Sequence, residues 1–333
     1  MKRLSRIRLL ECIENMREVK VLVAGDFMVD KYVWGSVDRI SPEAPVPVLV
    51  VDREEYRPGG AGNVAVNIGK LGGISIALGL CGNDQAASHL MSTLEERAVR
   101  VDGMVQTDNR PTTLKCRVVA HGQQLMRMDT EATHRPEQDE AHALVARAQH
   151  LITQVGAVVL QDYNKGTLTK ELITSMIRMS HERGIPVTAD PKFDNFFAYE
   201  KATLFKPNQS EVERALGIAI RDHQQLLNAG HELQQRLCVR MLLVTSGEQG
   251  MTLFAQDDDP QHIASRAREV FDVSGAGDTV IAVMTLALAS GASPLEASYL
   301  ANTAAGVCVS KVGTQPVSRE ELLREIKHDD SLG

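Results

Sequence analysis

The stretch Val19-Lys20-Val21-Leu22-Val23-Ala24-Gly25-Asp26 is a short apolar run that ends in a glycine and a carboxylate. Such a run is typical of a buried β-strand whose carboxyl end presents polar residues. Similar runs recur at residues 74–80, 156–160, 185–189 and 241–245, and stretches with helical periodicity, such as Lys170–Glu182, separate them. This alternation predicts an α/β fold with a mostly parallel central sheet that is covered by helices.

Two stretches, residues 31–57 and 111–130, interrupt the alternation. The first is rich in Val, Pro and turn residues, and in the second short β-type runs flank His121-Gly122. They predict a small β-rich lid inserted into a single domain that spans residues 1–333. The last third returns to helices, which we expect at 278–290 and from Pro294 to about residue 310.

Composition and charge exclude several classes of protein. The 333 residues are 43% hydrophobic and carry a net charge of -7, so the basic footprint of a nucleic-acid binder is missing. The five cysteines are scattered without a CxxC pair, which argues against disulfides or a zinc site and favours a reducing cytoplasm. No apolar stretch approaches the roughly 20 residues that a membrane helix needs. We therefore expect small-molecule partners in the cytoplasm, with no nucleic acid and no membrane.

The segment Asp272-Val273-Ser274-Gly275-Ala276-Gly277-Asp278-Thr279 precedes an apolar helical run. A glycine-rich turn that opens a helix directs free N–H groups and the positive end of the helix dipole at an anion. Asp278 lies inside this turn, so its carboxylate could accept the proton of a hydroxyl that attacks a phosphate. A capping aspartate in a plain glycine turn has the same local pattern, and both interpretations stay open at this point.

A second glycine-rich segment, Arg57-Pro58-Gly59-Gly60-Ala61-Gly62-Asn63, also leads into a helical pattern. Its glycines imitate the fingerprint of an NAD-dependent dehydrogenase. That fingerprint follows a strand directly, whereas the largely charged and polar residues 52–57 stand between Val51 and the glycines. The dehydrogenase is therefore only a third-ranked alternative.

Two further segments could serve a nucleotide. Asn208 and Glu211 share one face at the head of a predicted helix, where they could hold Mg²⁺ through water. A capping box would use the same two residues, and the two interpretations are compatible. The segment Thr245-Ser246-Gly247-Glu248-Gln249-Gly250 follows a predicted strand and offers Thr and Gly backbone to a nucleotide, although a plain strand–turn–strand has the same pattern.

The order of these segments resembles that of the ribokinase-like carbohydrate kinases, over nearly the whole chain. The resemblance is strongest to the branch that phosphorylates heptose 7-phosphate in lipopolysaccharide-core precursor synthesis. Three segments carry that closer resemblance: Gly25-Asp26-Phe27-Met28-Val29-Asp30-Lys31-Tyr32, Arg39-Ile40-Ser41-Pro42-Glu43-Ala44-Pro45-Val46-Pro47-Val48 and Asp162-Tyr163-Asn164-Lys165-Gly166.

The resemblance implies a ribokinase-like three-layer sandwich and an ATP-dependent kinase that uses Mg²⁺. It implies Asp278 as the base and an anion hole formed by Gly275, Ala276 and Gly277. For the sugar it implies contacts from Asp30, Gly59, Gly60, Asn63 and Asp162. For ATP and magnesium it implies Asn208 and Glu211, with Thr245, Gly247 and Gly250 lining the nucleotide cleft and Asn302 near adenine. It also implies a homodimer through the lid and, as in some relatives, a monovalent cation near Asp272, Ser274 and Gly313.

An acceptor that already carries a 7-phosphate needs a second basic pocket. Six basic residues lie in or near the lid and loops: Arg110, Lys115, Arg117, Arg127, Lys165 and Lys192. The sequence does not rank them, and each alone could be a solvated surface charge.

Two alternatives keep the same fold. One is another sugar or nucleoside kinase, and the other is a non-catalytic sugar-binding protein, which the intact Asp278 and glycines disfavour. Many bacterial relatives are fused to a nucleotidyltransferase with an HxGH signature, and no such pair occurs among the ten histidines. We therefore expect a kinase only.

Overall fold

The computed structural model describes residues 4–256, 258–267, 269–311, 313 and 315–332. Within these residues the larger sheet has nine strands in the order β13-β12-β11-β10-β9-β8-β1-β4-β5. All neighbours pair in parallel except β11 with β12 and β12 with β13. The strands are β1 (Lys20–Gly25), β4 (Ile74–Gly82), β5 (Arg100–Thr107), β8 (Ala157–Gln161), β9 (Val187–Asp190), β10 (Leu204–Phe205), β11 (Met241–Thr245), β12 (Met251–Ala255) and β13 (Gln261–Ile263).

Both faces of this sheet are buried. In β1 the side chains of Val21 and Val23 join one hydrophobic core, whereas Leu22 and Ala24 join the other. Successive strand residues point to opposite faces, so a strand covered on both sides reads as a continuous apolar run. The helix-covered parallel sheet that the sequence predicts, and the three-layer sandwich that the resemblance implies, are therefore confirmed.

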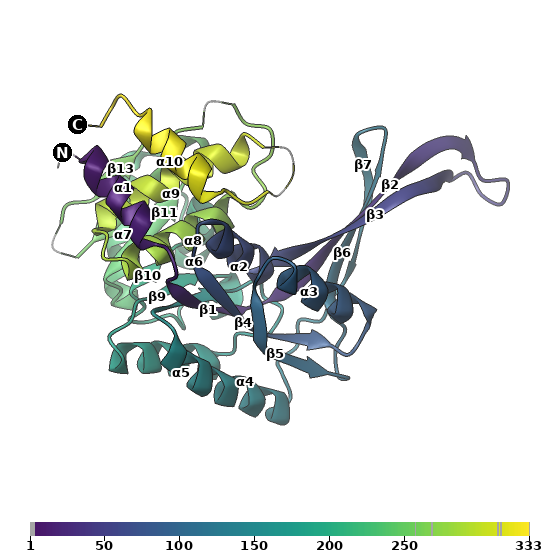
Figure 1. Ribbon diagram of the computed structural model, residues 1–333, viewed down its shortest axis with the longest axis horizontal. Helices are drawn as coiled ribbons and strands as arrows, with labels where there is room; N and C mark the ends of the chain where they lie inside the picture. Colours follow the sequence, from purple (N-terminus) through teal and green to yellow (C-terminus); the bar gives the residue numbers. More distant parts are fainter. Residues whose placement is uncertain (1–3, 257, 268, 312, 314, 333) are drawn as a thin grey trace.

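Helices form the two outer layers, and Figure 1 shows α4 and α5 below the sheet and α2 and α8 above it. One core receives side chains from α1 (Arg6–Asn15), α2 (Ala61–Lys70), α3 (Gln85–Glu95), α8 (Ala276–Ala289), α9 (Pro294–Val309) and α10 (Arg319–Lys327). The other receives them from α4 (Gln138–Leu151), α5 (Lys170–Glu182), α6 (Gln209–Leu216) and α7 (His223–Leu237).

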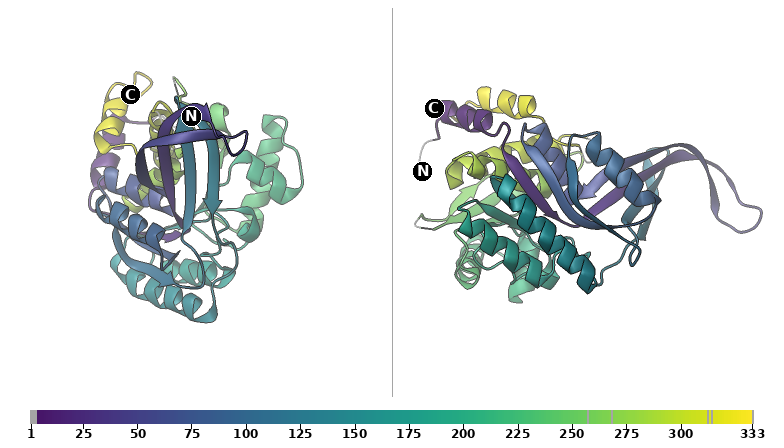
Figure 2. Two further views of the ribbon diagram at one scale, coloured as in Figure 1. Left: turned by 90° about the vertical axis from the view of Figure 1, so that its right-hand side faces the viewer. Right: turned by 60° about the horizontal axis from the view of Figure 1, so that its bottom comes forward.

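The lid is a second sheet with the strand order β3-β2-β6-β7, and it projects from the body of the molecule (Figures 1 and 2). Its strands are β2 (Phe27–Ile40), β3 (Pro47–Gly60), β6 (Thr113–Ala120) and β7 (Gln123–Thr130). β2 pairs with β6 in parallel, and the other two pairs are antiparallel. His121 and Gly122 join β6 to β7 with positive φ angles of 50° and 77°, as a tight two-residue hairpin requires.

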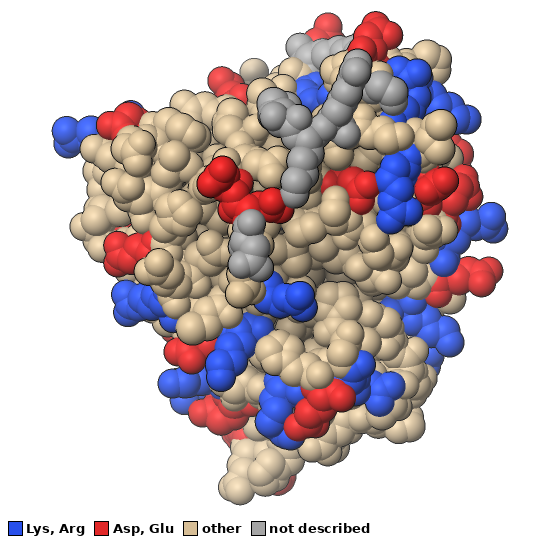
Figure 3. Space-filling view, turned by 90° about the vertical axis from the view of Figure 1, so that its left-hand side faces the viewer, with Lys and Arg blue, Asp and Glu red and all other residues tan. Residues whose placement is uncertain are grey.

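Some elements differ from the sequence-based expectation. The elements β5, β10, β13, α7 and α10 were not predicted, and α8 begins two residues earlier than residue 278. The early start follows from Gly275, whose φ of 82° lets the chain turn into the helix at Ala276. No helix in the described part of the chain is long and apolar enough to cross a membrane. On the face opposite the lid, basic and acidic side chains are intermixed (Figure 3).

Candidate active site

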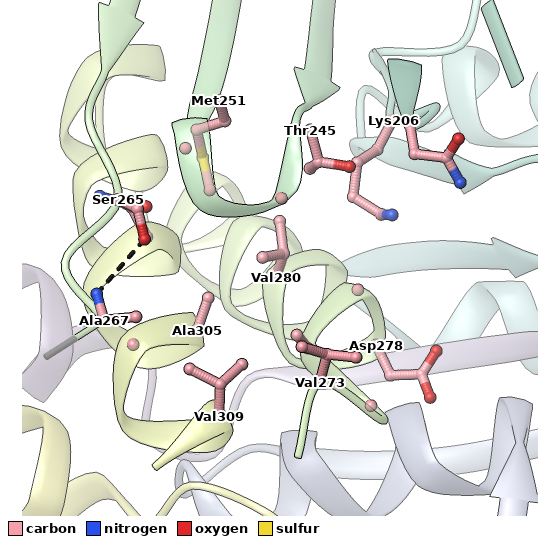
Figure 4. A pocket seen from close by; sticks show the side chains of 18 of the residues that line it. Lys206, Thr245, Met251, Ser265, Ala267, Val273, Asp278, Val280, Ala305 and Val309 are labelled. Carbon is pink, nitrogen blue, oxygen red and sulfur yellow. Dashed lines mark hydrogen bonds between the residues drawn. The ribbon is translucent and has the colours of Figure 1, made fainter. Parts of the chain in front are cut away.

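A cavity of about 670 Å³ opens at the carboxyl end of β9, β10 and β11, between these strands and the helices α8 and α9. Figure 4 shows Asp278 and Lys206 at one side of it and Met251, Ala305 and Val309 at the other. The cavity brings together most of the residues predicted for the nucleotide and the anion hole: Asn208, Thr245, Gly247, Gly250, Gly275, Ala276, Gly277 and Asn302. Asp278, the predicted base, and Lys192, a candidate for the distal phosphate, also line it. Ligands of open parallel sheets bind at this edge, because loops and helix N-termini converge there.

Asp278 lies in the first turn of α8 and is only 7% exposed. Its Oδ2 accepts a hydrogen bond from Asn63 Nδ2 at 2.7 Å, and its Oδ1 accepts one from the Tyr163 hydroxyl at 2.7 Å. Burial raises the pKa of Asp278 to about 6, and the two hydrogen bonds oppose that rise. A carboxylate with this pKa is ionised at neutral pH and basic enough to take a proton from a hydroxyl as it reacts.

A buried polar chain lies behind the carboxylate. Gln161 Nε2 donates to Asp278 Oδ1 at 3.2 Å and to Asp190 Oδ2 at 3.0 Å. Asp190 Oδ1 in turn pairs with Lys206 Nζ at 3.1 Å, and Lys206 is 3% exposed. Sequence reasoning did not select these three as site residues. The available signal was their position, because each ends or directly follows a strand whose carboxyl end meets the cavity.

The predicted sugar ligands lie on the lid side of Asp278. Gly60 ends β3 and precedes α2, whose first turn carries Asn63. Gly59 packs against Asp30: a Cβ on Gly59 would lie 2.5 Å from Asp30 Oδ2, so a side chain there would displace the Asp30 carboxylate. Asp30 Oδ1 also accepts a hydrogen bond of 2.5 Å from Arg117 Nη1. The structure thus places Asp30, Gly59, Gly60 and Asn63 along one path from the lid to Asp278.

Asp162 is not among the cavity residues. Its carboxylate accepts hydrogen bonds from the Tyr199 hydroxyl at 2.8 Å and from the backbone N–H of Asn164 at 2.8 Å. Burial, with the nearby Asp26, raises the pKa of Asp162 to about 6. Alternation along extended backbone explains the placement, because Gln161 and its second neighbour Tyr163 turn toward Asp278 and the residue between them turns away. This geometry favours a structural role for Asp162.

Asp26 and Arg110 hold the loop that follows β8. Asp26 is buried and accepts backbone N–H bonds from Tyr163, Lys165 and Thr167 at 2.8, 3.0 and 3.1 Å. Arg110 is also buried, and its two terminal nitrogens donate to the carbonyls of Lys165 and His134 at 2.9 and 2.5 Å. The terminal nitrogens of Arg110, which was predicted as a phosphate ligand, therefore donate to backbone carbonyls.

Asn208 and Glu211 form the capping box at the start of α6. Asn208 Oδ1 accepts from the N–H of Glu211 at 2.8 Å, and Glu211 Oε2 accepts from the N–H of Asn208 at 2.9 Å. The other Glu211 oxygen pairs with Lys192 Nζ. Amide and carboxylate oxygens are suitable for Mg²⁺, and in the described residues no group of three or more His, Cys, Asp or Glu could hold a metal directly. Asn208 Oδ1 and both Glu211 oxygens already have these local partners, so the two residues could hold magnesium only through water.

Two other predicted positions are occupied by local contacts. Asn302 lines the cavity, but its amide donates to the carbonyl of Ala264 at 2.7 Å and so holds the loop after β13. In the region predicted for a monovalent cation, Asp272 Oδ1 accepts from the N–H of Ser274 at 2.8 Å. Residues 312 and 314, on either side of Gly313, lie outside the described residues. The cation remains a prediction.

The remaining basic candidates separate into two groups. Lys192 is on the cavity side, with its Nζ 5.7 Å from the centre of the Tyr163 ring. Burial lowers the pKa of Lys192, but the charges of Asp190 and Glu211 outweigh that effect, so its pKa is raised. Lys115 and Lys165 lie at the base of the lid, where both pair with Glu131, and Arg127 pairs with Asp129 at 2.9 Å.

A buried carboxylate in the first turn of a helix, beside a cavity at the carboxyl edge of a parallel sheet, is suited to phosphoryl transfer. The model of the pfkB family carbohydrate kinases matches residues 19–321. The chain therefore belongs to the pfkB family of carbohydrate kinases, which makes it an ATP-dependent sugar kinase and confirms the family that its motifs resemble.

Known proteins of two kinds are similar to the chain. It is 43% identical over 319 residues to the bifunctional protein HldE of Geobacter metallireducens and 45% identical over 315 residues to that of Yersinia enterocolitica. Each match covers 95% of this chain and 65% of the relative, so the chain spans about two thirds of these curated proteins.

The solved structures support the fold. Arabidopsis thaliana ribokinase complexed with ribose and ATP has a TM-score of 0.74 at 22% identity, covering 94% of this chain and 100% of that one. Escherichia coli phosphofructokinase-2 in complex with potassium has a TM-score of 0.76 at 22% identity, covering 94% and 99%.

Proposed function

We propose that the chain transfers the γ-phosphoryl group of ATP to the anomeric hydroxyl of D-glycero-D-manno-heptose 7-phosphate. The product is heptose 1,7-bisphosphate, an intermediate on the route to ADP-heptose and the lipopolysaccharide core. The kinase chemistry rests on one observation, the buried Asp278 carboxylate at the N-terminus of α8 beside the cavity. The heptose rests on the sequence segments at 25–32, 39–48 and 162–166, supported by the identity to the HldE proteins.

In this mechanism the acceptor hydroxyl lies between Asp278 and the γ-phosphate. The hydroxyl oxygen attacks the γ-phosphorus while its proton passes to Asp278. The bond from the γ-phosphorus to the β–γ bridging oxygen breaks, and ADP leaves with the electron pair. The N–H groups of the first turn of α8 stabilise the charge on the transferring group, because they are fixed donors in a site shielded from water.

Tyr163 and Asn63 hold the Asp278 carboxylate toward the acceptor, since each donates to a different oxygen of it. Burial, with the Asp278 charge, raises the pKa of Tyr163 well above its ordinary value, so the hydroxyl stays a donor throughout. Lys192 and Lys206 line the cavity and supply positive charge for the ATP phosphates. Mg²⁺, held through water by Asn208 and Glu211, would neutralise part of the phosphate charge.

The acceptor is tested by measuring ADP release from ATP and Mg²⁺ with four compounds: D-glycero-D-manno-heptose 7-phosphate, ribose, fructose 6-phosphate and adenosine. We expect kcat/KM to be highest for the heptose phosphate, because an enzyme selects substrates by its contacts in the transition state. Preferred turnover of another compound would contradict the proposed acceptor and leave Asp278 in its role. No turnover with any of the four would contradict the acceptor and the mechanism together.

We also propose that two copies of the chain pair through their lids. Met126 and Met128 point to the same face of β7 and are 55% and 49% exposed, and Val50 and Val51 on β3 are 51% and 52% exposed. Exposed apolar side chains on both edge strands of the lid sheet are typical of an interaction surface. Light scattering of the unchanged chain is expected to give twice the mass of one chain, which is 36.4 kDa. The double variant Met126→Lys and Met128→Lys is expected to be a monomer with the mass of one chain. A monomeric unchanged chain would contradict the pairing.

A further inference from the structure

Two lysines from distant parts of the chain meet on one carboxylate at the base of the lid. Lys115 belongs to β6, and Lys165 belongs to the loop after β8. Their Nζ atoms lie 3.6 and 2.8 Å from Glu131 Oε2. The side chains of Lys115 and Lys165 are 18% and 17% exposed, so both ammonium groups are largely withdrawn from water.

The charges around Glu131 leave a positive surplus. Lys115 also pairs with Asp129 at 3.2 Å, and Arg127 pairs with the same Asp129. Three cations thus share two carboxylates. Glu131 lies between two ammonium groups, and the hydrogen bond from Lys165 lowers its pKa, so it remains an anion there. An anion of higher charge would be held more strongly at the same position.

The backbone around these lysines is fixed before any ligand binds. The N–H of Lys165 donates to Asp26 Oδ2 at 3.0 Å, and its carbonyl accepts from Arg110 Nη1 at 2.9 Å. Lys115 is held in the lid sheet, where its register partners are Asp30 on β2 and Asp129 on β7. Register partners share a face of a sheet, so Lys115 lies on the side of Asp30, next to the proposed sugar path.

The other basic candidates are already engaged elsewhere. Arg110 donates to two backbone carbonyls, and Lys192 pairs with Glu211 beside the nucleotide cavity. Arg117 pairs with Asp30 itself. Lys115 and Lys165 are the two that converge on a carboxylate belonging to neither the nucleotide cavity nor the sugar path.

We propose that Lys115 and Lys165 bind the phosphate that the acceptor already carries, and that Glu131 occupies this position until the acceptor displaces it. This inference rests on the proposed function, because it requires a phosphorylated sugar as the acceptor. A phosphate monoester carries about -1.5 to -2 charges at neutral pH, so it outcompetes a single carboxylate for two ammonium groups. An uncharged sugar end cannot displace Glu131, so the carboxylate also selects against unphosphorylated sugars.

The test compares Lys115→Met, Lys165→Met and Glu131→Gln in steady-state kinetics with heptose 7-phosphate and with the same heptose lacking the phosphate. Each lysine variant is expected to raise KM for the heptose phosphate roughly 10- to 100-fold, because hydrogen bonds to charged groups are of that strength. The KM for ATP and the kcat should change only slightly. Glu131→Gln should lower KM for the heptose phosphate and strengthen competitive inhibition by inorganic phosphate, because it removes the competing charge.

Lys31→Met is the matched control. Lys31 lies on β2 of the same lid, is 21% exposed and pairs with Glu54 at 2.7 Å, but as the next residue after Asp30 it points to the opposite face. Its KM for the heptose phosphate should equal that of the unchanged chain. A similar rise in KM for Lys31→Met would show a general effect of lid charge and overturn the inference.

The outcomes separate this inference from the proposed function. Unchanged KM in both lysine variants, with normal turnover of heptose 7-phosphate by the unchanged chain, overturns only the phosphate position. A higher KM in Glu131→Gln overturns it as well, and this variant keeps the test valid if a lysine variant does not fold. Turnover of unphosphorylated sugars alone overturns both proposals. If fructose 6-phosphate is the acceptor, the proposed function fails, and the same variants assayed with it decide the phosphate position.

Discussion

Asp278→Asn is expected to bind ATP and the sugar almost as tightly as the unchanged chain and to turn over about 10²- to 10⁴-fold more slowly. Asparagine has nearly the shape of aspartate, and its carbonyl oxygen can still accept from Asn63 or Tyr163, which both donate to Asp278. What it cannot do is take the proton of the acceptor hydroxyl. The measurement is kcat from ADP release together with the Kd of both substrates from calorimetry.

The pH dependence ties this loss to the carboxylate. Because the base must be ionised and burial raises the pKa of Asp278 to about 6, kcat/KM of the unchanged chain should fall about tenfold per pH unit below that value. The Asp278→Asn variant should lack this acid limb. Turnover within a few-fold of the unchanged chain would exclude Asp278 as the base.

Stability distinguishes a chemical loss from a structural one. The pKa of Asp278 is about 6 in the folded chain against the ordinary 3.8, so the folded state binds more protons in this window and stability falls as pH rises through it. At pH 8 the removal of a buried charge should therefore leave Tm equal or higher. Asp162→Asn is the comparison: this carboxyl has a similar pKa but faces Tyr199, so kcat should stay near that of the unchanged chain.

The sequence predicts those parts of the fold and site that depend on neighbours along the chain. The apolar run at 19–24 becomes β1, and the helix predicted at Lys170–Glu182 has those bounds in the structure. The pair Asn208 and Glu211 likewise forms the capping box that its spacing allows. In each case the pattern and the structure are both local, so no knowledge of tertiary contacts is needed.

Contacts between distant segments are beyond such patterns. Asp278 receives hydrogen bonds from residues 215 and 115 positions earlier, Asn63 and Tyr163, because α2 packs on α8 and β8 ends beneath it. The sequence could not tell Asp162 from its neighbours either. A shift of one residue reverses the face, and only the packed sheet shows that Gln161 and Tyr163 turn toward Asp278.

The basic residues show the same limit. Six of them fall in or near the lid and loops, and the sequence gives them equal standing. The position of Lys115 depends on strand register, because it lies across from Asp30 on one side and from Asp129 on the other. The position of Lys165 depends on a loop that is anchored by Asp26, the residue after β1. Charge in the sequence therefore identifies candidate phosphate ligands. The choice among them depends on the partners that each basic side chain already has in the structure.

Gly277→Pro is expected to lower kcat about 10²- to 10³-fold, the cost of removing one fixed donor to a developing anion. Gly277 is the second residue of α8, so its N–H has no partner within the helix, and the first turn of a helix tolerates proline. The substitution removes the N–H group that we assign to the transferring phosphoryl group. The measurement is kcat with heptose 7-phosphate, with Tm measured in parallel because proline disfavours helical backbone at Ala276.

Gly277→Ala is the control that separates the lost N–H from the added side chain. Among the residues that the structure describes, a Cβ at Gly277 would meet only Lys206 Nζ, at 3.5 Å, which is an ordinary contact, so the alanine variant should keep kcat within a few-fold. Equal losses in both variants would attribute the effect to side-chain volume. If the proline variant is as active as the alanine variant, the Gly277 N–H is not part of the anion hole. Lys192, Lys206 and the metal would then stabilise the charge of the transferring group.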